Sequence, residues 1–314
     1  MPASATVFVD PSQFPDALQA GLINSLRTRQ INHKFHYATY RQAEKWIALH
    51  EAYSPARNDP DCKAIYDKAF TAAAKSSITE VVGLGCGGGE KDARLLAKLA
   101  RRNVHYTPVD ASLPLVLQAR SAALENLPEE RIRPGVICDL ASAAGLTFQG
   151  SPKLLVFFGM LPNFEPNEII PRIGALLARG DYLLCSANLA PGTDYAKGVR
   201  QVLPQYDNEL TNDWLMVLLQ DLGIEKDAGR IEWNIEPSAG LFRITAHFQF
   251  HASSEITYSN NQFKFGPGDT LRLFFSYRYT PYLLDKMLAA QGLQTKNQWT
   301  SRSGEEAVFL CQKL

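Results

Sequence analysis

The stretch that decides the fold of this chain is Val81-Val82-Gly83-Leu84-Gly85-Cys86-Gly87-Gly88-Gly89-Glu90-Lys91. Residues 79–82 predict a short buried strand, and residues 92–99 predict the beginning of a helix. Five glycines occupy the seven positions 83–89 between them. Glycine permits a tight turn and leaves no Cβ between the backbone N–H groups and an approaching ligand. A strand, a glycine turn and a helix in this order predict the nucleotide-binding loop of an α/β protein.

The alternation of strand and helix continues after the loop as far as residue 188. Short apolar stretches predict strands, and amphipathic stretches between them predict helices. Strands that alternate with helices in this way predict a parallel sheet covered on both faces. The predicted strands are 78–84, 103–110, 135–139, 153–158 and 181–188, and the predicted helices are 92–102, 113–126 and 166–178.

The pattern changes at Leu189-Ala190-Pro191-Gly192. Residues 195–222 are predicted to be helical, and residues 229–265 alternate between apolar and polar side chains as antiparallel strands do. A C-terminal helix followed by two strands, the last of them antiparallel, is typical of a class I methyltransferase sheet and not of a dinucleotide-binding domain. The predicted C-terminal elements are strand 270–277, helix 281–291, strand 295–300 and strand 307–312.

These elements predict an α/β fold with two interlocked parts, which suits a chain of 314 residues. Residues 77–190 and 270–314 are predicted to form a doubly wound, Rossmann-like sheet with an antiparallel last strand. Residues 1–76 and 191–269 are predicted to form a second, α+β module that binds the substrate.

The composition narrows the classes of function. Lysine and arginine balance aspartate and glutamate to a net charge of zero without any basic block, which argues against a nucleic-acid partner. No apolar stretch approaches the roughly 20 residues that cross a bilayer, and residues 1–7 lack the pattern of a secretory signal. The 5 cysteines are scattered without CxxC spacing, and no HExxH motif occurs. We therefore expect reduced thiols, a cytoplasmic protein, no membrane partner and no metal site.

The glycine loop is compatible with two classes of cofactor. Residues 83–88 fit G-x-G-x-x-G, and Asp110 ends the second predicted strand, a pattern typical of NAD as well as S-adenosylmethionine (SAM). Asp139 ends the third strand, where SAM enzymes commonly hold the adenine amino group. Lys91 begins the helix, where it can meet a ligand carboxylate. With the C-terminal elements, these residues favour SAM; an NAD(P)-dependent oxidoreductase and a SAM-binding module without catalysis are the alternatives.

Three segments carry a resemblance to a known family. They are Gly85-Cys86-Gly87-Gly88-Gly89-Glu90-Lys91, Tyr106-Thr107-Pro108-Val109-Asp110-Ala111-Ser112 and Asn163-Phe164-Glu165-Pro166. In these segments the chain resembles the histidine-specific methyltransferase family, whose members use SAM to methylate the α-amino group of an amino acid. The resemblance covers most of the chain. It implies a monomer, a small-molecule substrate, and S-adenosylhomocysteine (SAH) as the product.

The resemblance implies a role in cofactor binding for five residues. Gly85, Gly87 and Lys91 fall in the family's cofactor loop. Asp110 matches the acid that binds the ribose, and Asp139 matches the acid beside the adenine.

The resemblance also implies residues for the substrate. Asn163 matches an asparagine that helps to hold the amino acid, and Tyr206 matches a tyrosine that binds its carboxylate. Tyr37 and Tyr53 fall in a region similar to the family's tyrosine-bearing N-terminal helices. Methyl transfer from a sulfonium mainly requires that a neutral amine be aligned with the methyl group. Tyr206 and Asn163 are therefore the candidate catalytic residues, because either can accept or relay the amine proton.

The chain departs from the family's pattern in three places. Gly83 replaces an acidic residue often found before the loop, and the segment 159–163 is one residue shorter than in the family. The histidine enzymes carry a Glu two residues before a Ser, and both hold the imidazole ring. Here Ser276 is kept, and Phe274 stands where the Glu would be.

The third departure bears on the substrate. Without the Glu, a buried imidazole N–H loses a hydrogen bond of about 1.5–3 kcal/mol. A phenyl ring instead favours an aromatic partner by about 0.5–1.5 kcal/mol. The sequence predicts a SAM-dependent N-methyltransferase of an aromatic or apolar amino acid or related amine, with histidine as the alternative acceptor. The competing interpretation of Phe274 is that it points into the sheet core.

Overall fold

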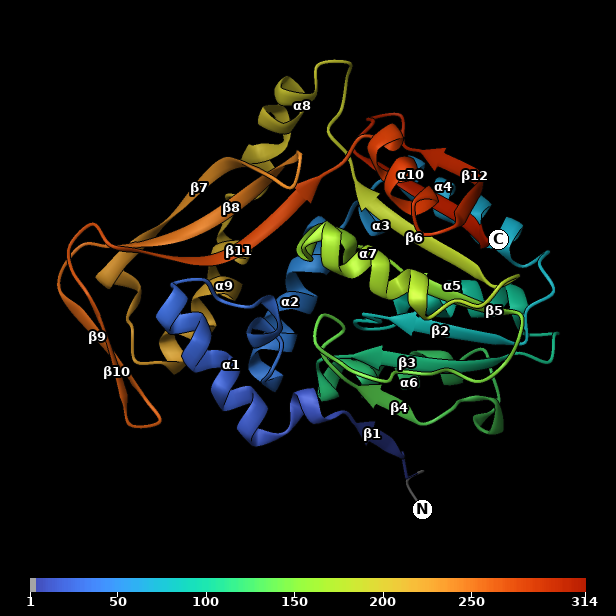
Figure 1. Ribbon diagram of the computed structural model, residues 1–314, viewed down its shortest axis with the longest axis horizontal. Coiled ribbons are helices and arrows are strands. Elements are labelled where there is room, and N and C mark those ends of the chain that lie inside the picture. Colours follow the sequence, from blue (N-terminus) through green and yellow to red (C-terminus); the bar gives the residue numbers. More distant parts are fainter. Residues whose placement is uncertain (1–3) are drawn as a thin grey trace.

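The glycine loop connects β2 (Glu80–Leu84) to α5 (Glu90–Leu99) in the computed structural model, which describes residues 4–314 (Figure 1). β2 lies inside an eight-stranded sheet of order β1-β4-β3-β2-β5-β6-β13-β12. All neighbours are parallel except β13, which is antiparallel to both β6 and β12. The predicted parallel sheet with an antiparallel last strand is confirmed. Its other strands are β1 (Val7–Val9), β3 (His105–Asp110), β4 (Gly135–Ile137), β5 (Lys153–Phe157), β6 (Tyr182–Asn188), β12 (Leu293–Thr300) and β13 (Glu306–Lys313).

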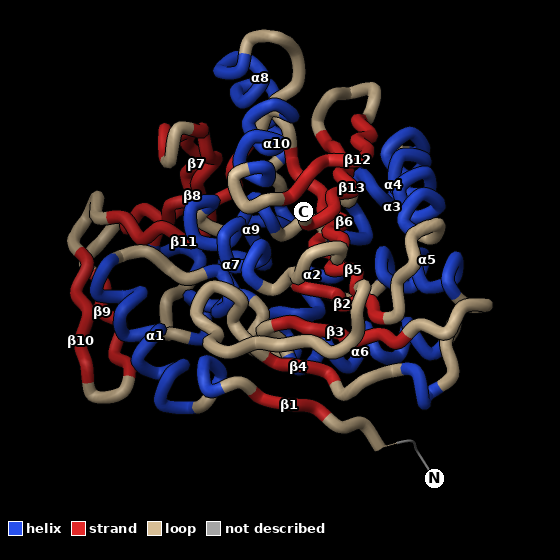
Figure 2. The backbone as a smooth tube through the Cα atoms, turned by 45° about the vertical axis from the view of Figure 1, so that its right-hand side comes forward, coloured by secondary structure: helices blue, strands red, loops and turns tan. Residues whose placement is uncertain are grey.

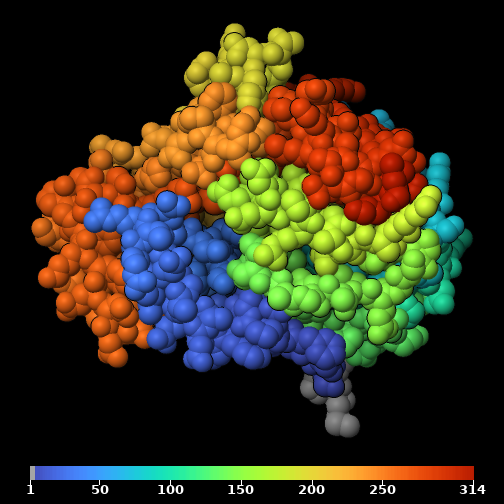
Figure 3. Space-filling view, viewed as in Figure 1, coloured from blue at the N-terminus to red at the C-terminus, as the bar shows by residue number. Residues whose placement is uncertain are grey.

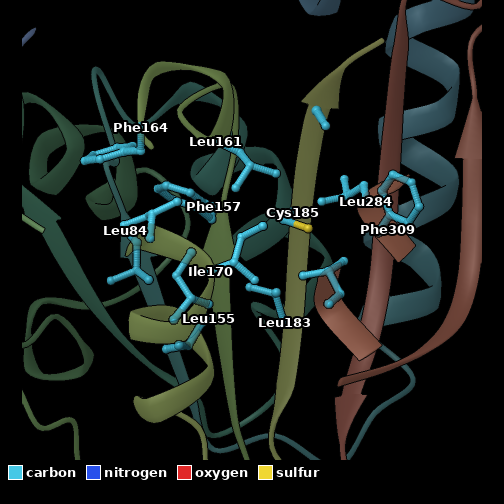
Figure 4. Packing of buried hydrophobic residues seen from close by; sticks show 14 of the residues in the cluster. Leu84, Leu155, Phe157, Leu161, Phe164, Ile170, Leu183, Cys185, Leu284 and Phe309 are labelled. Carbon is cyan, nitrogen blue, oxygen red and sulfur yellow. The ribbon is translucent and has the colours of Figure 1, made fainter. Parts of the chain in front are cut away.

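Helices cover both faces of this sheet, as the alternating pattern predicts. On one face Leu84, Phe157, Cys185 and Phe309 pack against α7 and α10, and Figure 4 shows these side chains gathered in one layer. On the other face α4, α5 and α6 bury apolar side chains such as Phe70 against the strands. The helices are α4 (Pro60–Ala73), α6 (Leu113–Leu124), α7 (Pro166–Ala175) and α10 (Pro281–Ala289).

A second module lies to one side of the central strands (Figure 2), at the end toward which the arrows of β2, β3 and β4 point in Figure 1. Three antiparallel strands in the order β11-β8-β7 form its main sheet, and β9 and β10 form a hairpin next to α1. In the space-filling view the N-terminal segment and residues around 240–275 adjoin each other on one side of the molecule (Figure 3). Its elements are α1 (Pro15–Thr28), α2 (Tyr40–Tyr53), α3 (Pro55–Asn58), α8 (Tyr195–Val202), α9 (Glu209–Asp221), β7 (Gly229–Ser238), β8 (Leu241–Phe250), β9 (Ser254–Tyr258), β10 (Asn261–Phe265) and β11 (Thr270–Arg278).

The position of β11 corrects one prediction. The sequence assigns this strand to the central sheet, but β11 pairs along its length with β8 of the second module. Leu271 and Leu273 are fully buried in the core of that module, together with Trp214 and Phe248. Pairing with an adjacent antiparallel strand and burial of these side chains keep β11 there, so the C-terminal contribution to the central sheet begins only after β11.

The N-terminal segment is shared between the two parts, which the sequence did not predict. β1 extends the central sheet by pairing with β4, and α4 packs against β12 and β13. The predicted helical stretch 195–222 is two helices, because Pro204 lies in a short 3-10 turn and Asn208 caps α9. Within residues 4–314 no helix combines the length and apolar character needed to cross a bilayer. Residues 1–3, part of the stretch inspected for a secretory signal, lie outside the described residues.

Candidate active site

A cavity of about 840 Å³ lies between the carboxyl ends of the central strands and the second module. Its position is where open α/β sheets bind ligands, next to the strands at which the chain order reverses. A volume of this size lies in the upper part of the range of ligand pockets, roughly 300–1,000 Å³, and is compatible with a cofactor together with a small second ligand. All of the residues predicted for the site line this cavity: Tyr37, Tyr53, Gly85, Gly87, Lys91, Asp110, Asp139, Asn163, Tyr206, Phe274 and Ser276.

The glycine loop is packed too closely for larger residues. Gly85 and Gly87 have φ angles of 58° and 53°, in the left-handed region that side chains disfavour. A Cβ on Gly85 would lie 2.7 Å from the side chain of Met160. A Cβ on Gly87 would lie 2.7 Å from the ring of Trp46, which α2 places over the loop. The loop therefore presents bare backbone to the cavity, as the glycine pattern predicts.

Asp110 is the last residue of β3, and its carboxylate holds the glycine loop in place by a hydrogen bond. One carboxylate oxygen accepts the Gly87 N–H at 3.0 Å, and the other accepts the Ser112 N–H at 3.0 Å. Burial raises the pKa of Asp110 to about 6, although these backbone donors oppose the rise. A carboxylate has about four acceptor positions, so Asp110 keeps acceptor capacity for a ligand.

Asp139 follows β4 and forms a buried ion pair that the sequence did not predict. The Lys34 ammonium donates to its carboxylate at 3.0 Å, and both side chains are buried. The Ala141 N–H and the Ser142 hydroxyl donate to the same carboxylate at 3.0 and 2.9 Å. Burial would raise the pKa of Asp139, but the charge and hydrogen bond of Lys34 outweigh it and lower the pKa. Through Lys34, the second module thus contributes a positive charge to the part of the cavity that contains Asp139.

Asp92 is a site residue that sequence reasoning missed. Its carboxylate accepts the Tyr106 hydroxyl at 2.6 Å and lies over Gly83, where a Cβ would stand 2.1 Å from Oδ2. A carboxylate from α5 therefore fills the space of the side chain that Gly83 lacks. Burial raises the pKa of Asp92 to about 7. Asp92 precedes Leu95, Leu96 and Leu99 by three, four and seven residues, and this spacing on the apolar helix face was the available signal.

Lys91 and Glu90 have separate partners. Glu90 forms an ion pair with Arg57 of α3. The Lys91 ammonium lies 5.0 Å from the centre of the Tyr66 ring, and no ion pair within residues 4–314 includes it. Lys91 thus brings a positive charge to the cavity without a direct ion pair to another residue of the described chain.

A comparison with protein families identifies the class of enzyme. The model of a family described as histidine-specific, SAM-dependent methyltransferases matches residues 17–313, nearly the whole chain. The chain belongs to this family. The match confirms SAM as the cofactor, and the NAD(P)-dependent oxidoreductase is excluded as an alternative.

No curated protein sequence matches this methyltransferase significantly, but several solved structures are similar to it. Similar solved structures include N-methyltransferase NodS from Bradyrhizobium japonicum in complex with SAH, with 9% identity, a TM-score of 0.48, and coverage of 87% of this chain and 97% of that chain. Another is magnesium protoporphyrin IX methyltransferase from Synechocystis with bound SAH, with 12% identity, a TM-score of 0.47, and coverage of 90% of this chain and 98% of that chain.

The residues around the loop of the methyltransferase fit the chemistry of SAM. SAM carries a carboxylate, ribose hydroxyls and an adenine amino group. Lys91 offers a cation, and Asp110 and Asp139 offer hydrogen-bond acceptors on the same cavity. When bound, SAM supplies a methyl group that its positively charged sulfur activates.

Strand β11 of the methyltransferase contributes a wall to the same cavity. The period of two along the strand, after a bulge between Arg272 and Phe274, places Phe274, Ser276 and Arg278 on the face that lines the cavity. The Phe274 ring lies 6.0–6.2 Å from the ring centres of Tyr206, Trp214 and Trp233. Phe274 therefore lines the cavity and belongs to an aromatic cluster at its wall.

Tyr206 has a hydrogen-bonding arrangement that the sequence did not predict. Its hydroxyl donates to Ser276 Oγ at 2.9 Å and accepts from Arg278 Nη2 at 2.6 Å. Arg278 is buried and also lines the cavity, although no sequence pattern singled it out. The three residues form one connected group.

The remaining predicted residues differ in burial. Asn163 is buried, and its Nδ2 donates to the Phe275 carbonyl at 2.8 Å. Tyr37 is buried between Trp46 and Trp214, with ring centres 5.8 and 5.4 Å away. Tyr53 is 54% exposed and lies at the rim of the cavity. Among residues 4–314 no group of three or more His, Cys, Asp or Glu side chains is arranged to hold a metal ion.

Proposed function

We propose that this enzyme transfers the methyl group of SAM to the amino group of an amino acid or related small amine whose side chain is aromatic or apolar. The observation that carries the proposal is the aromatic wall that Phe274 forms with Tyr206 and Trp214, which line the cavity with it. Offset and edge-to-face contacts with such rings favour an aromatic ligand. A histidine side chain would lack a carboxylate acceptor at position 274.

On the cofactor side, Lys91 binds the methionine carboxylate in this proposal, and Asp110 binds the ribose hydroxyls. Asp110 is held in place by the Gly87 and Ser112 N–H groups, so it needs no rearrangement to accept the ribose. Asp139 accepts three hydrogen bonds within the chain. Its remaining acceptor position suits the adenine amino group.

Asn163 aligns the attacking amine in this proposal. The Phe275 carbonyl can only accept, so the amide of Asn163 turns Nδ2 toward it and leaves Oδ1 for an amine N–H. Holding the amine in line with the activated methyl group supplies most of the acceleration that such a transfer needs. Tyr206 is the second candidate, although its hydroxyl already has partners on both sides.

The proposal is tested by measuring SAH release from SAM with a panel of amino acids and their decarboxylated amines. Tryptophan and phenylalanine are expected to be methylated faster than histidine at equal concentration. Faster methylation of histidine would support the alternative, a histidine Nα-methyltransferase. Tight SAH binding with no activity on the whole panel would support a SAM-binding module without catalysis.

Substitution of Phe274 sharpens this test. Phe274→Glu restores an acceptor beside Ser276, and we expect the ratio of histidine to tryptophan methylation to rise about tenfold for one added charged hydrogen bond. Phe274→Gln is the matched control, because it has the size of Glu without the charge. An equal rise in both variants would contradict a role for charge at this position.

We also infer a monomeric, cytoplasmic enzyme without a nucleic-acid or membrane partner. The resemblance to the family supports the monomer, the scattered cysteines support a reducing compartment, and the balanced charge argues against nucleic acid. Light scattering of the eluted protein during size-exclusion chromatography tests the oligomeric state.

A further inference from the structure

Glu306, the first residue of β13, places a buried carboxylate on the cavity. Its side chain is 7% exposed and lines the cavity. One carboxylate oxygen accepts a hydrogen bond from the Tyr66 hydroxyl, and the other accepts from the Cys62 thiol at 3.5 Å. No ion pair within the described range 4–314 includes Glu306. Because burying a charge without an opposite charge is unfavourable, a cationic group of a ligand is the natural partner of this carboxylate.

The two donors to Glu306 come from α4 and are uncharged. Burial, together with the charge of Glu306, raises the pKa of the Tyr66 hydroxyl and of the Cys62 thiol, so both groups keep their protons. Such donors orient the carboxylate but do not neutralise it. A carboxylate has about four acceptor positions, and Tyr66 and Cys62 occupy one on each oxygen. Glu306 is therefore held in place and keeps acceptor capacity for a ligand.

Lys91 lies beside the same tyrosine. Its ammonium is 5.0 Å from the centre of the Tyr66 ring, and the hydroxyl of that ring donates to Glu306. Lys91 and Glu306 both line the cavity, yet neither belongs to an ion pair within residues 4–314. One tyrosine thus contacts a positive and a negative group that are not paired with each other. A ligand that carries a carboxylate and an ammonium on one carbon can satisfy both charges.

The chemistry of methyl transfer indicates which ligand pairs with Glu306. The acceptor amine must lose its proton before it attacks the methyl group, and a carboxylate beside it would stabilise the protonated form. The ammonium group of SAM keeps its proton throughout the reaction. Lys91 directly follows the glycine loop, so the two charges lie where the cofactor is bound. These considerations favour the methionine end of SAM over the acceptor.

We propose that Glu306 binds the α-ammonium group of SAM and SAH while Lys91 binds their carboxylate. The inference rests on the role of Lys91 in the proposed function, and it adds a binding residue from the last strand of the sheet. Tyr66 and Cys62 are positioning residues that act through the Glu306 carboxylate. The enzyme then selects cofactors that carry a free ammonium group.

The test measures binding of two ligands to the full-length protein by isothermal titration calorimetry. The ligands are SAH and its deaminated analogue, in which hydrogen replaces the α-ammonium group. We expect the wild type to bind SAH about 10- to 100-fold more tightly than the analogue, the range of one charge-assisted hydrogen bond. Equal affinity for the two ligands would overturn the proposal.

Glu306→Gln locates the effect on one side chain. Glutamine keeps the size of glutamate and an acceptor for Tyr66 but loses the charge, so SAH should bind about tenfold more weakly or worse. The affinity for the deaminated analogue should stay close to that of the wild type, which also shows that the site is folded. An equal loss for both ligands would mean that Glu306 only supports the structure, and would refute its assignment as the ammonium partner.

Glu305→Gln is the matched control. Glu305 also lines the cavity, and its carboxylate accepts from Gln205 Nε2 at 3.0 Å. This variant should keep the wild-type preference for SAH over the analogue, whereas Tyr66→Phe should lose part of the preference. Equal effects of Glu305→Gln and Glu306→Gln would overturn the proposal in favour of a general effect of negative charge around the cavity.

This inference and the proposed function fail in distinguishable ways. The binding assay contains no acceptor, so its outcome does not depend on methyl transfer. A preference for SAH that Glu306→Gln removes, with an inactive amino-acid panel, would overturn the proposed function and leave this inference standing. An unchanged preference in Glu306→Gln, with a raised KM for an amino-acid acceptor, would overturn this inference and leave the proposed function intact.

Discussion

Replacing Gly83 by alanine tests the packing beneath the cofactor loop. Gly83 lies in the buried strand β2, and a Cβ there would stand 2.1 Å from Asp92 Oδ2 and 2.9 Å from the Tyr106 hydroxyl. Real Cβ atoms do not approach other atoms so closely. The Asp92 side chain must therefore rotate away, which breaks its 2.6 Å hydrogen bond with Tyr106.

Gly83→Ala lowers the free energy of unfolding through two effects that add. Losing the hydrogen bond strands a buried polar group, which costs about 1–3 kcal/mol. Forcing extra volume into a packed interior costs about 1–3 kcal/mol more. We therefore expect the free energy of unfolding to fall by roughly 2–6 kcal/mol.

A double-mutant cycle isolates the contact between the two residues. Urea unfolding is followed by circular dichroism and tryptophan fluorescence for Gly83→Ala, Asp92→Ala and the double variant. Once Asp92 is alanine, the nearest remaining atom is the Tyr106 hydroxyl at 2.9 Å, which is the free end of a side chain. Gly83→Ala should then cost less than about 1 kcal/mol, which gives a coupling energy of at least about 1 kcal/mol.

Gly88→Ala is the matched control in the same loop. A Cβ on Gly88 would lie 3.6 Å from the Gln118 side chain, an ordinary contact. Its effect is expected to stay within about 1 kcal/mol of zero. Equal losses at Gly83 and Gly88, or a coupling energy near zero, would refute the reasoning that Asp92 occupies the space above Gly83.

Two buried ionisable side chains, Asp92 and Lys34, yield further predictions. Because the pKa of Asp92 rises from 3.8 to about 7, the native state keeps a proton there that the unfolded chain loses, and stability falls as pH rises through this window. The free energy of unfolding then falls by up to about 1.4 kcal/mol per pH unit. Urea titrations at several pH values should give a flatter dependence for Asp92→Asn, and a dependence parallel to that of the wild type would contradict this. Lys34→Met strands the buried carboxylate of Asp139 and should cost about 3–5 kcal/mol. Arg41→Met, which removes an exposed ion pair, should cost less than about 1 kcal/mol in the same assay, and equal losses would mean that the Lys34 pair is not desolvated.

The central sheet and the cofactor loop were predictable because their signals are local. Glycines between a strand and a helix, and acids at strand ends, are visible along the chain, and the structure brings Gly85, Gly87, Asp110 and Asp139 to one cavity. Parallel strands place their carboxyl ends at one edge of the sheet, so residues that follow them must meet there.

The features that the sequence did not predict come from pairings between segments that are far apart in the chain. β11 was assigned to the central sheet because its apolar pattern suits either sheet, and only pairing with β8 decides between them. Likewise, the ion pair of Lys34 with Asp139 joins residues 105 positions apart, and no local pattern announces it.

The sequence alone determined the class of fold and the cofactor, and it predicted residues that the structure brings to one cavity. These predictions depend on periodicity, on glycines and acids at strand ends, and on the resemblance to the family. The tertiary structure decided which of those residues already form hydrogen bonds or ion pairs within the chain, and with which partners. The ion pair of Lys34 with Asp139 shows the physical reason: the two residues are far apart in the sequence, and only the fold buries both side chains and brings their charges together. Burial and hydrogen-bond partners are properties of the folded chain.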